Sequence, residues 1–170
     1  MTNKNDELTV AAVMQVVVKS VPSEMSLPDL EDEMLRDGVS GFPVVDDNKL
    51  VGVISRSDIV RQLSAERAVA EHTSDFYFDE KGFFERKMES FKDIADRVGE
   101  RIEGLSVRDV MVKNPLTTRM DQPISETAKS FVEHHIHRLP VTDAGILVGI
   151  VTTTDLVRLV AEKRIVAAGH

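Results

Sequence analysis

The sequence predicts a mixed α/β (α+β) fold built from two copies of one supersecondary unit. The first observation is an internal repeat, because Leu8–Leu63 aligns with Leu105–Val160 at a constant shift of 97 residues and without a gap. The second is that each copy reads as helix, strand, helix, strand, strand, helix. The residues of the first copy that recur in the second are Leu8, Val10, Val13, Met14, Pro43, Val44, Asp46, Leu50, Val51, Gly52, Asp58, Val60 and Arg61. Two copies of one unit must bury an apolar face against each other, so we expect the function to lie where they meet.

Composition excludes several function classes. The net charge of −8 argues against nucleic-acid binding, which needs a basic face, and fits poorly with an anionic membrane surface. No apolar run approaches the roughly 20 residues that span a bilayer, and Met1–Thr9 lacks an apolar signal core. Cysteine is absent, which removes disulfides and thiolate metal sites and suits a reducing compartment. We therefore expect a cytoplasmic protein with no nucleic-acid or membrane partner.

Each copy opens with a short helix and a strand. Ser106 and Asp109 form a capping-box pattern at the start of the second copy, with Asp in place of the usual Glu. Strands are predicted near Val16–Val21 and, in the second copy, near Leu116–Arg119.

The next helices are predicted to start around Pro28 and Ser125, because Pro and acidic residues suit a first helical turn. The residues expected on their inward faces are Leu30, Met34 and Leu35 in the first copy and Thr127, Phe131 and Val132 in the second. Gly38 is suited to end the first helix, whereas its counterpart is His135, so the two helix ends are expected to differ.

Two apolar runs with turn residues between them predict a β-hairpin in each copy. The first is Phe42–Val45 and Leu50–Ile54 around the turn Asp46–Lys49. The second joins Leu139–Thr142 to Ile146–Val151. The final helices are expected to begin after Ser57 and Thr154, both good N-cap residues.

The segment Ser64–Gly104 separates the copies. Its first part continues the preceding helix through about Glu71, and Thr73–Gly82 is expected to be a loop. A helical stripe at steps of four and three follows, formed by Phe84, Met88, Phe91, Ala95, Val98 and Ile102. This stripe packs either on its own module or on another chain. The predicted organisation is a first repeat at 1–72, a loop and amphipathic linker helix at 73–104, and a second repeat at 105–170.

The strongest local pattern runs from Gly52 to Asp58 and recurs from Gly149 to Asp155. In each, a strand ends in hydroxyl residues and a helix begins with an acid. A helix N-terminus and hydroxyls suit a phosphate, and a carboxylate accepts hydrogen bonds from the paired hydroxyls of a ribose. The glycine lets a flat group approach the backbone.

A purely structural interpretation of this pattern stays open. Ser57 and Thr154 could simply cap the helices while the two aspartates complement the helix dipole. Arg61 and Arg158 lie three residues after the aspartates, a spacing that favours helical ion pairs over ligand contact.

Taken together, these motifs resemble a tandem pair of CBS (cystathionine-β-synthase) domains, the arrangement known as a Bateman module. The resemblance covers about two-thirds of the chain. It rests on Val10–Met14, Val107–Met111, Asn114–Thr117, Phe42–Asp46, Leu139–Asp143 and the two glycine-to-aspartate motifs. It implies two β-α-β-β-α repeats about a pseudo-twofold axis, with clefts between their sheets. In the family these clefts commonly hold adenosine compounds such as AMP, ADP, ATP, S-adenosylmethionine or a dinucleotide, and no obligatory cofactor is implied.

The resemblance also assigns roles to residues. Asp58 and Asp155 inherit the ribose contact, and the nearby hydroxyls inherit ribose or phosphate contacts. Thr117 inherits an adenine-side contact, with Ser20 as a weaker counterpart. The implied ligand-binding set is Ser20, Gly41, Phe42, Pro43, Ser55, Arg56, Ser57, Asp58, Thr117, His137, Arg138, Leu139, Pro140, Thr152, Thr153, Thr154 and Asp155.

His137 and Arg138 resemble the His-Arg pair that contacts phosphate in adenylate-sensing modules of this family. The fixed fork of an Arg side chain suits two phosphate oxygens. The first copy has Ser40 and Gly41 instead, so the two clefts are expected to be unequal, with Arg138 favouring phosphorylated ligands. Which aspartate the pair serves stays open. The first copy also has Val17-Val18 where the second has Asn114-Pro115, so it departs from the family pattern at its first strand.

Competing interpretations concern metal, catalysis and assembly. His134, His135 and His137 are close in sequence, but we expect them to point apart rather than bind a metal. Nothing near the motifs is placed to activate water or a nucleophile, so an enzyme is not expected.

We expect a stand-alone regulatory module, an energy sensor that binds an adenine nucleotide, forms a homodimer and signals to a protein target in trans. The alternative is a scaffold with empty clefts, in which the linker helix holds a dimer or a partner.

Overall fold

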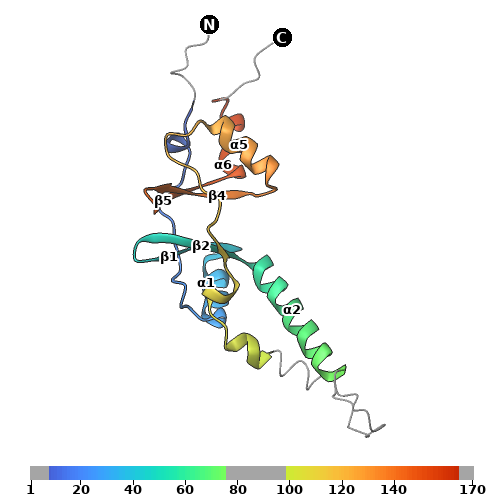
Figure 1. Ribbon diagram of the computed structural model, residues 1–170. Helices are drawn as coiled ribbons and strands as arrows, with labels where there is room; N and C mark the ends of the chain where they lie inside the picture. Colours follow the sequence, from blue (N-terminus) through green and yellow to red (C-terminus); the bar gives the residue numbers. More distant parts are fainter. Residues whose placement is uncertain (1–7, 76–98, 165–170) are drawn as a thin grey trace, which may run out of the picture. The chain divides into compact units, whose positions relative to one another are not determined.

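The computed structural model describes the backbone of residues 8–75 and 99–164 (Figure 1). These residues belong to two compact units. Unit 1 combines Met1–Ser20, Val45–Val51 and Asn114–His170, and unit 2 combines Val21–Val44 and Gly52–Lys113. Each unit therefore contains the leading segment of the other repeat. The repeat boundaries expected from the sequence stay a prediction.

Unit 1 is built on an antiparallel hairpin. Its elements are the 3-10 helix η1 (Val10–Ala12), α5 (Ile124–Glu133), β4 (Arg138–Asp143), β5 (Ile146–Thr152) and α6 (Thr153–Ala161). β4 and β5 pair from Arg138–Thr152 to Asp143–Ile146, and α5 and α6 lie on the same side of this hairpin (Figure 1). The core between them consists of Val10, Phe131, Leu139, Val141 and Val151. A residue of the first repeat, Val10, is thus central to the core of the second hairpin.

Unit 2 has the equivalent plan. Its elements are α1 (Leu27–Asp37), most of β1 (Gly41–Asp46) and of β2 (Lys49–Ser55), α2 (Arg56–Asp75), α4 (Val107–Val110) and β3 (Val112–Lys113). Its buried apolar residues are Val21, Leu27, Leu30, Met34, Phe42, Val44, Ile54 and Val107. Val107 takes the place here that Val10 takes in unit 1, as the shift of 97 requires.

The leading segments pair with the hairpins in the same register in both units. Gln15 bridges Ile150 in unit 1, and Val112 pairs with Val53 in unit 2. The strands predicted near Val16–Val21 and Leu116–Arg119 are wrong, because only isolated bridges form there. In the second copy, Asn114 adopts a φ of 51° and Pro115 has no backbone N–H to donate. The chain therefore turns after Lys113 instead of continuing the strand pairing.

The capping box predicted for the second leading segment is confirmed. The Asp109 carboxylate accepts hydrogen bonds from the backbone N–H and the hydroxyl of Ser106, both at 2.8 Å. This capping box lies at the start of α4, a helix of only 4 residues.

Helices α1 and α5 begin close to the predicted positions but bury a different stripe. Leu35 is 63% exposed and Val132 is 73% exposed, so the prediction that both face inward is wrong. The buried positions are instead Leu27, Leu30 and Met34, and the equivalent Ile124, Thr127 and Phe131. Positions spaced by three and four stay on one face, whereas the next residue is rotated by about 100°.

The two helix ends are more alike than the sequence indicates. Gly38 has a φ of 65°, and its counterpart His135 also takes a left-handed conformation, with a φ of 52°. The N–H of Val39 donates to Met34, as that of Ile136 donates to Phe131. The expected difference between the ends is therefore wrong for the backbone, since a non-glycine residue adopts the conformation that glycine favours.

Both predicted hairpins are present. Asp47 and Asn48 have φ values of 48° and 63°, and Ala144 and Gly145 have values of 48° and 84°. Two consecutive residues with positive φ form the type I′ turn that matches the strand twist of a hairpin.

Helix α2 extends further than predicted, through Asp75, because no Gly or Pro interrupts Glu71–Ser74. The rest of the expected loop and the linker stripe lie outside the described residues, except for Ile102. Within the part of the chain that the structure describes, no helix has the length and apolar character needed to cross a bilayer.

Candidate functional site

In unit 1, backbone hydrogen bonds bring three motifs of the second repeat together. The N–H of Thr118 donates to the Pro140 carbonyl at 3.0 Å, and the N–H of Thr153 donates to the His137 carbonyl at 3.0 Å. Arg138 pairs with Thr152 across the hairpin. Thr117, His137–Pro140 and Thr152–Asp155 are therefore neighbours, and we call this region the Asp155 site.

Unit 2 repeats this arrangement around Asp58. The N–H of Val21 donates to the Pro43 carbonyl at 3.1 Å, and the N–H of Arg56 donates to the Ser40 carbonyl at 3.0 Å. The region of Val21, Gly41–Pro43 and Ser55–Asp58 is the Asp58 site, and Ser20 directly precedes Val21 in the chain. The side chains of Arg56, Ser57 and Thr154 are exposed, whereas Phe42, Pro43, Leu139 and Pro140 are buried.

Each site contains a buried carboxylate folded back onto the end of the preceding strand. Asp58 is 7% exposed and Asp155 is 2% exposed. Oδ2 of Asp58 accepts from the N–H of Ser55 at 2.8 Å and from its hydroxyl at 2.5 Å. Oδ2 of Asp155 accepts in the same way from Thr152, at 2.8 and 2.7 Å. One oxygen of each carboxylate is thus fixed, and the other is directed elsewhere.

The N-caps lie two residues earlier than predicted. Thr152, not Thr154, caps α6 and accepts from the N–H of Asp155 in a capping box. Ser55, not Ser57, holds the equivalent place before α2, which begins at Arg56. The prediction is wrong because the acid occupies the third helical position, so its cap must lie three residues before it.

The second oxygen of each carboxylate faces an arginine one turn along the helix. Oδ1 of Asp58 lies 3.3 Å from Arg61, and Oδ1 of Asp155 lies 3.6 Å from Arg158. The helical ion pairs predicted from the spacing are confirmed. Both arginine side chains are mostly exposed, so these pairs hold the carboxylates loosely.

The sequence did not reveal Gln15. Its side-chain amide nitrogen donates to Oδ1 of Asp155 at 3.2 Å, from the leading segment of the first repeat. One signal was available, because the shift of 97 places Gln15 opposite the apolar Val112. A polar residue at one of two equivalent positions marks a local difference between the sites.

The two motif glycines, Gly52 and Gly149, allow the backbone of a leading segment to approach closely. A Cβ on Gly149 would lie 2.9 Å from the Gln15 carbonyl oxygen, and one on Gly52 would lie 2.9 Å from that of Val112. The prediction that a flat ligand uses this approach is therefore wrong, since the leading segments already occupy it.

The His-Arg pair marks a further difference between the sites. His137 and Arg138 are exposed at the start of β4. At the equivalent position, a Cβ on Gly41 would lie 2.5 Å from the Ile54 carbonyl oxygen, so no side chain fits there. Only the Asp155 site can present an arginine at this position. The phosphate contact expected of the pair stays a prediction.

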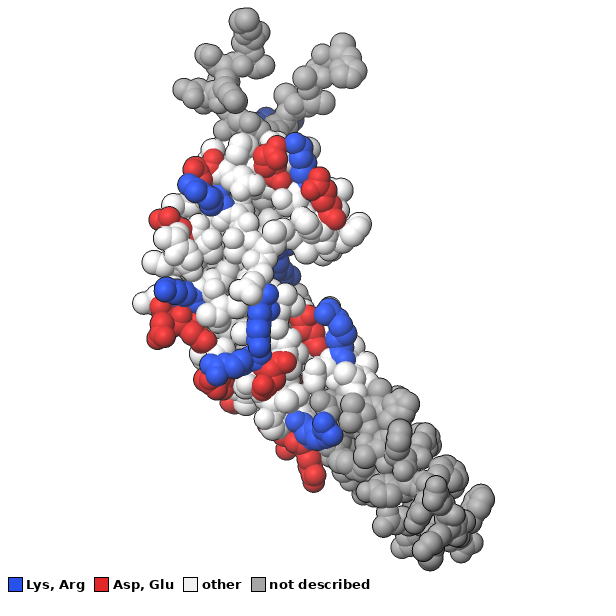
Figure 2. Space-filling view, in the orientation of Figure 1, with Lys and Arg blue, Asp and Glu red and all other residues white. Residues whose placement is uncertain are grey.

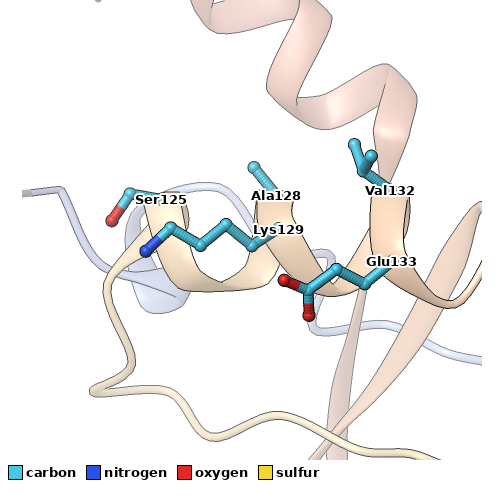
Figure 3. A pocket seen from close by; sticks show the side chains of 5 residues that line it. All are labelled: Ser125, Ala128, Lys129, Val132 and Glu133. Atoms are coloured by element: carbon cyan, nitrogen blue, oxygen red, sulfur yellow. The ribbon is translucent and has the colours of Figure 1, made fainter.

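Two hollows lie on unit 1. One, of about 400 Å³, is lined by Phe131, Val132, His135, Ile136, His137 and Thr153, and so includes two of the expected site residues. The other, of about 320 Å³, lies along α5 and is lined by Ser125, Ala128, Lys129, Val132 and Glu133 (Figure 3). The α5 hollow contains none of the expected site residues.

The described residues carry charge of both signs and contain no group of three His, Asp or Glu side chains that could hold a metal ion. His134 is the C-cap residue that follows α5, whereas His135 and His137 line the same hollow. In Figure 2, acidic and basic side chains alternate over the visible face, with no large basic patch.

Comparison with known proteins identifies the family to which the two repeats belong. The family model described as CBS domain matches residues 10–65 and 107–162. The chain belongs to the CBS domain family. Its two matched segments are the repeats recognised in the sequence, and its mixed α+β fold with two CBS repeats is confirmed.

Several known proteins are similar in sequence. An uncharacterised protein of Methanocaldococcus jannaschii, MJ1426, is 34% identical over 129 residues, which cover 72% of this chain and 73% of that protein. The chloroplastic CBS domain-containing protein CBSX2 of Arabidopsis thaliana is 31% identical over 140 residues, covering 81% of this chain. The matched part spans 56% of CBSX2, about half its length.

The fold is also shared with solved CBS pairs. A crystal structure of CBSX2 in complex with AMP has a TM-score of 0.66 and 26% identity, and covers 92% of this chain and 98% of that one. The CBS domain pair of MJ0100, in complex with 5′-methylthioadenosine and S-adenosylmethionine, has a TM-score of 0.62 at 21% identity, with the same coverage. The second likeness concerns the fold alone.

Proposed function

We propose that this protein is a regulatory CBS pair that binds an adenosine nucleotide, AMP, ADP or ATP, at the Asp58 and Asp155 sites. One observation carries the proposal. Each site holds a buried carboxylate whose Oδ2 is fixed by the preceding cap, while Oδ1 faces outward to an exposed arginine. An oriented carboxylate of this kind suits a ribose diol, which donates two hydrogen bonds.

The neighbouring motifs fit the rest of a nucleotide. The buried Pro43 and Pro140 lie beside the segments that contain Ser20 and Thr117, which are suited to the base. Arg138 and His137 supply the cationic and polar groups that phosphate prefers. The AMP complex of CBSX2, at 26% identity, supports the same ligand class here. S-adenosylmethionine carries the same adenosine group and is the principal competitor.

Regulation follows if the ligand binds two conformations of the module with different affinity. The hydroxyls of Ser55 and Thr152 donate to the two motif carboxylates, and these carboxylates are engaged in capping and in ion pairs. Ligand occupancy would then be read by a protein target in trans, as an energy sensor requires.

A thermal-shift titration with AMP, ADP, ATP and S-adenosylmethionine tests the proposal. Ligand at about 100 times its Kd stabilises a protein by about 2.7 kcal/mol, which corresponds to several degrees in Tm. Asp58→Asn and Arg138→Ala are expected to reduce the shift. Arg119→Ala is the matched control, because Arg119 is an exposed arginine of unit 1 that pairs with Asp121. No shift with any of the four compounds at millimolar concentration would contradict the proposal.

A second role, assembly into a homodimer, is favoured by a separate observation. Exposed apolar side chains occur at equivalent positions of both repeats, three in each unit. They are Leu35, Val60 and Leu63 on α1 and α2, and Val132, Val157 and Val160 on α5 and α6. A second copy of the chain presents the same two faces, so a symmetric dimer can cover them all.

The assembly role is tested by native mass spectrometry of Val132→Lys and Val157→Lys variants. We expect the wild type to be a dimer and the variants to shift toward monomer. Thr154→Lys, an exposed position near the start of α6, is the control. A wild-type monomer at micromolar concentration would contradict this role without affecting nucleotide binding.

A further inference from the structure

The two carboxylates are bound alike by their caps but differ in one further donor. Oδ2 of each accepts from the N–H and hydroxyl of its cap, Ser55 or Thr152. The Gln15 amide lies within reach of both oxygens of Asp155, 3.2 Å from Oδ1 and 3.5 Å from Oδ2. Among the described residues, Oδ1 of Asp58 faces one group, the Arg61 guanidinium, in an ion pair at 3.3 Å. Oδ1 of Asp155 faces two, the Arg158 guanidinium in an ion pair at 3.6 Å and the Gln15 amide, which donates a hydrogen bond at 3.2 Å. The difference therefore lies at the oxygen that a ribose diol would use.

A carboxylate has room for about four donors. Among the residues that the structure describes, Asp155 has three hydrogen-bond donors and one ion-pair partner, whereas Asp58 has two hydrogen-bond donors and one ion-pair partner. Asp155 is correspondingly the more deeply buried, at 2% against 7% exposure. A ligand reaching Asp155 must displace a donor that a ligand reaching Asp58 does not meet.

The backbone fixes Gln15 in this place. Its N–H donates to the Ile150 carbonyl at 2.9 Å, and the N–H of Ile150 donates back at 2.9 Å. The preceding residue, Met14, packs against Gly149. Gln15 is exposed and Asp155 is buried, so the donating amide belongs to a residue that is accessible to solvent. In unit 2 the same register places Val112 opposite Val53, and the side chain of a valine has no hydrogen-bond donor.

We infer that Gln15 is a specificity-determining residue that makes the Asp155 site the weaker of the two for adenosine nucleotides. This inference rests on the proposed function. The ribose binds first at Asp58, and at Asp155 only when the Gln15 amide leaves Oδ1. Because the ribose hydroxyl takes the place of the amide at the same carboxylate, the net loss is that of an ordinary hydrogen bond, which is expected to weaken the Asp155 site by about three- to tenfold relative to the site without this donor.

Isothermal titration of the full chain with AMP tests the inference. We expect two unequal events in the wild type. Gln15→Val, which copies Val112, should tighten the weaker event by about three- to tenfold and leave the stronger one unchanged. The reciprocal Val112→Gln should weaken the stronger event. Val17→Ala, at an exposed position of the same segment, is the control and should change neither.

The melting temperature of the unliganded protein distinguishes an effect of Gln15→Val on ligand binding from a general effect on folding. Gln15→Val removes a hydrogen bond from a buried carboxylate, so the unliganded variant should melt at a lower temperature than the wild type. A gain in affinity together with a lower Tm cannot come from better folding. Asp155→Asn, where it folds, should remove the event that Gln15→Val tightens.

Four outcomes would overturn the inference. If the wild type binds AMP at two equal sites, or if Gln15→Val weakens or does not change the weaker event, Gln15 has no such role, although the proposed function stands. If neither the wild type nor Gln15→Val binds AMP or ATP, both the proposed function and this inference fail. The wild type could also show a single binding event that Asp58→Asn abolishes. In that case the inference is supported if Gln15→Val adds a second event, and it is overturned if Gln15→Val adds none.

Discussion

Met14 packs against Gly149, with its sulfur 3.0 Å from the position that a Cβ on this glycine would take. Met111 makes the equivalent contact with Gly52, where that distance is 2.6 Å. In each pair the methionine comes from one repeat and the glycine from the other. The Val-Met and glycine motifs therefore recur together because they are the two halves of one packing contact.

Gly52→Ala is expected to lower the free energy of unfolding by about 1–3 kcal/mol, the usual cost of overpacking. A Cβ there would meet the Met111 side chain and, at 2.9 Å, the backbone oxygen of Val112. The side chain can move, but the backbone oxygen cannot move without shifting β3. Urea denaturation monitored by circular dichroism measures the change.

Gly99→Ala is the matched control, because a Cβ on this helical glycine would meet nothing within 4 Å. It should be neutral or slightly stabilising, since Ala favours helix over Gly. Equal destabilisation by both substitutions would show that the loss does not come from the contact with the leading segment.

Ser106→Ala is expected to raise the pKa of Asp109 toward its ordinary value. The pKa of Asp109 is lowered chiefly by the hydrogen bond from the backbone N–H of Ser106 and next by that from its hydroxyl. The variant removes the hydroxyl and keeps the N–H, so only part of the shift should disappear. NMR titration of the carboxyl carbon measures both states, and Asp121, whose pKa is lowered by Arg119, is an internal control that should not move.

The hydrogen bonds from Ser106 to the Asp109 carboxylate also make the stability of the protein depend on pH in a defined direction. A carboxyl whose pKa is lower in the folded state contributes stability above its unfolded pKa, and this contribution is lost as the pH falls through the folded pKa. Loss of the cap should cost about 1 kcal/mol at neutral pH. The difference in the free energy of unfolding between the wild type and Ser106→Ala should therefore become smaller as the pH falls. A difference that stays constant or grows would contradict the role of Asp109.

Phe131→Ala and Val132→Ala are expected to differ sharply although they are neighbours on α5. Phe131 is 5% exposed within the core of unit 1, so its truncation should cost about 3–5 kcal/mol. Val132 is exposed, so its truncation should change the free energy of unfolding by less than about 0.5 kcal/mol in the monomer. Similar losses in thermal unfolding would contradict the observed face of α5.

Local chemistry made much of the fold predictable. The turn residues at Asp47-Asn48 and Ala144-Gly145, the capping box at Ser106 and the ion pair of Asp155 with Arg158 depend on residues close in sequence. The N-caps were misplaced by two residues because several hydroxyls stand in a row, and only the folded carboxylate shows which one it faces.

The exchange of leading segments was not predictable from local patterns. Nothing in the sequence near Met14 indicates that it packs on Gly149 rather than on the glycine of its own repeat. Gln15 was missed for the same reason, since its partner Asp155 lies 140 residues away. Such contacts are set by the tertiary arrangement of a duplicated chain, in which either copy could supply the segment.

His135→Gly is expected to be neutral or stabilising, whereas His134→Gly should lower the free energy of unfolding by about 0.5–1 kcal/mol. His135 has a φ of 52° and His134 a φ of −99°, so the two positions differ in backbone and not in residue type. A left-handed conformation costs a non-glycine residue about 1–2 kcal/mol, which glycine at 135 recovers and glycine at 134 does not. Chemical denaturation of both variants compares them directly. If the two substitutions destabilise equally, the His135 side chain must contribute contacts around the hollow that it lines with His137, and those contacts offset its backbone strain.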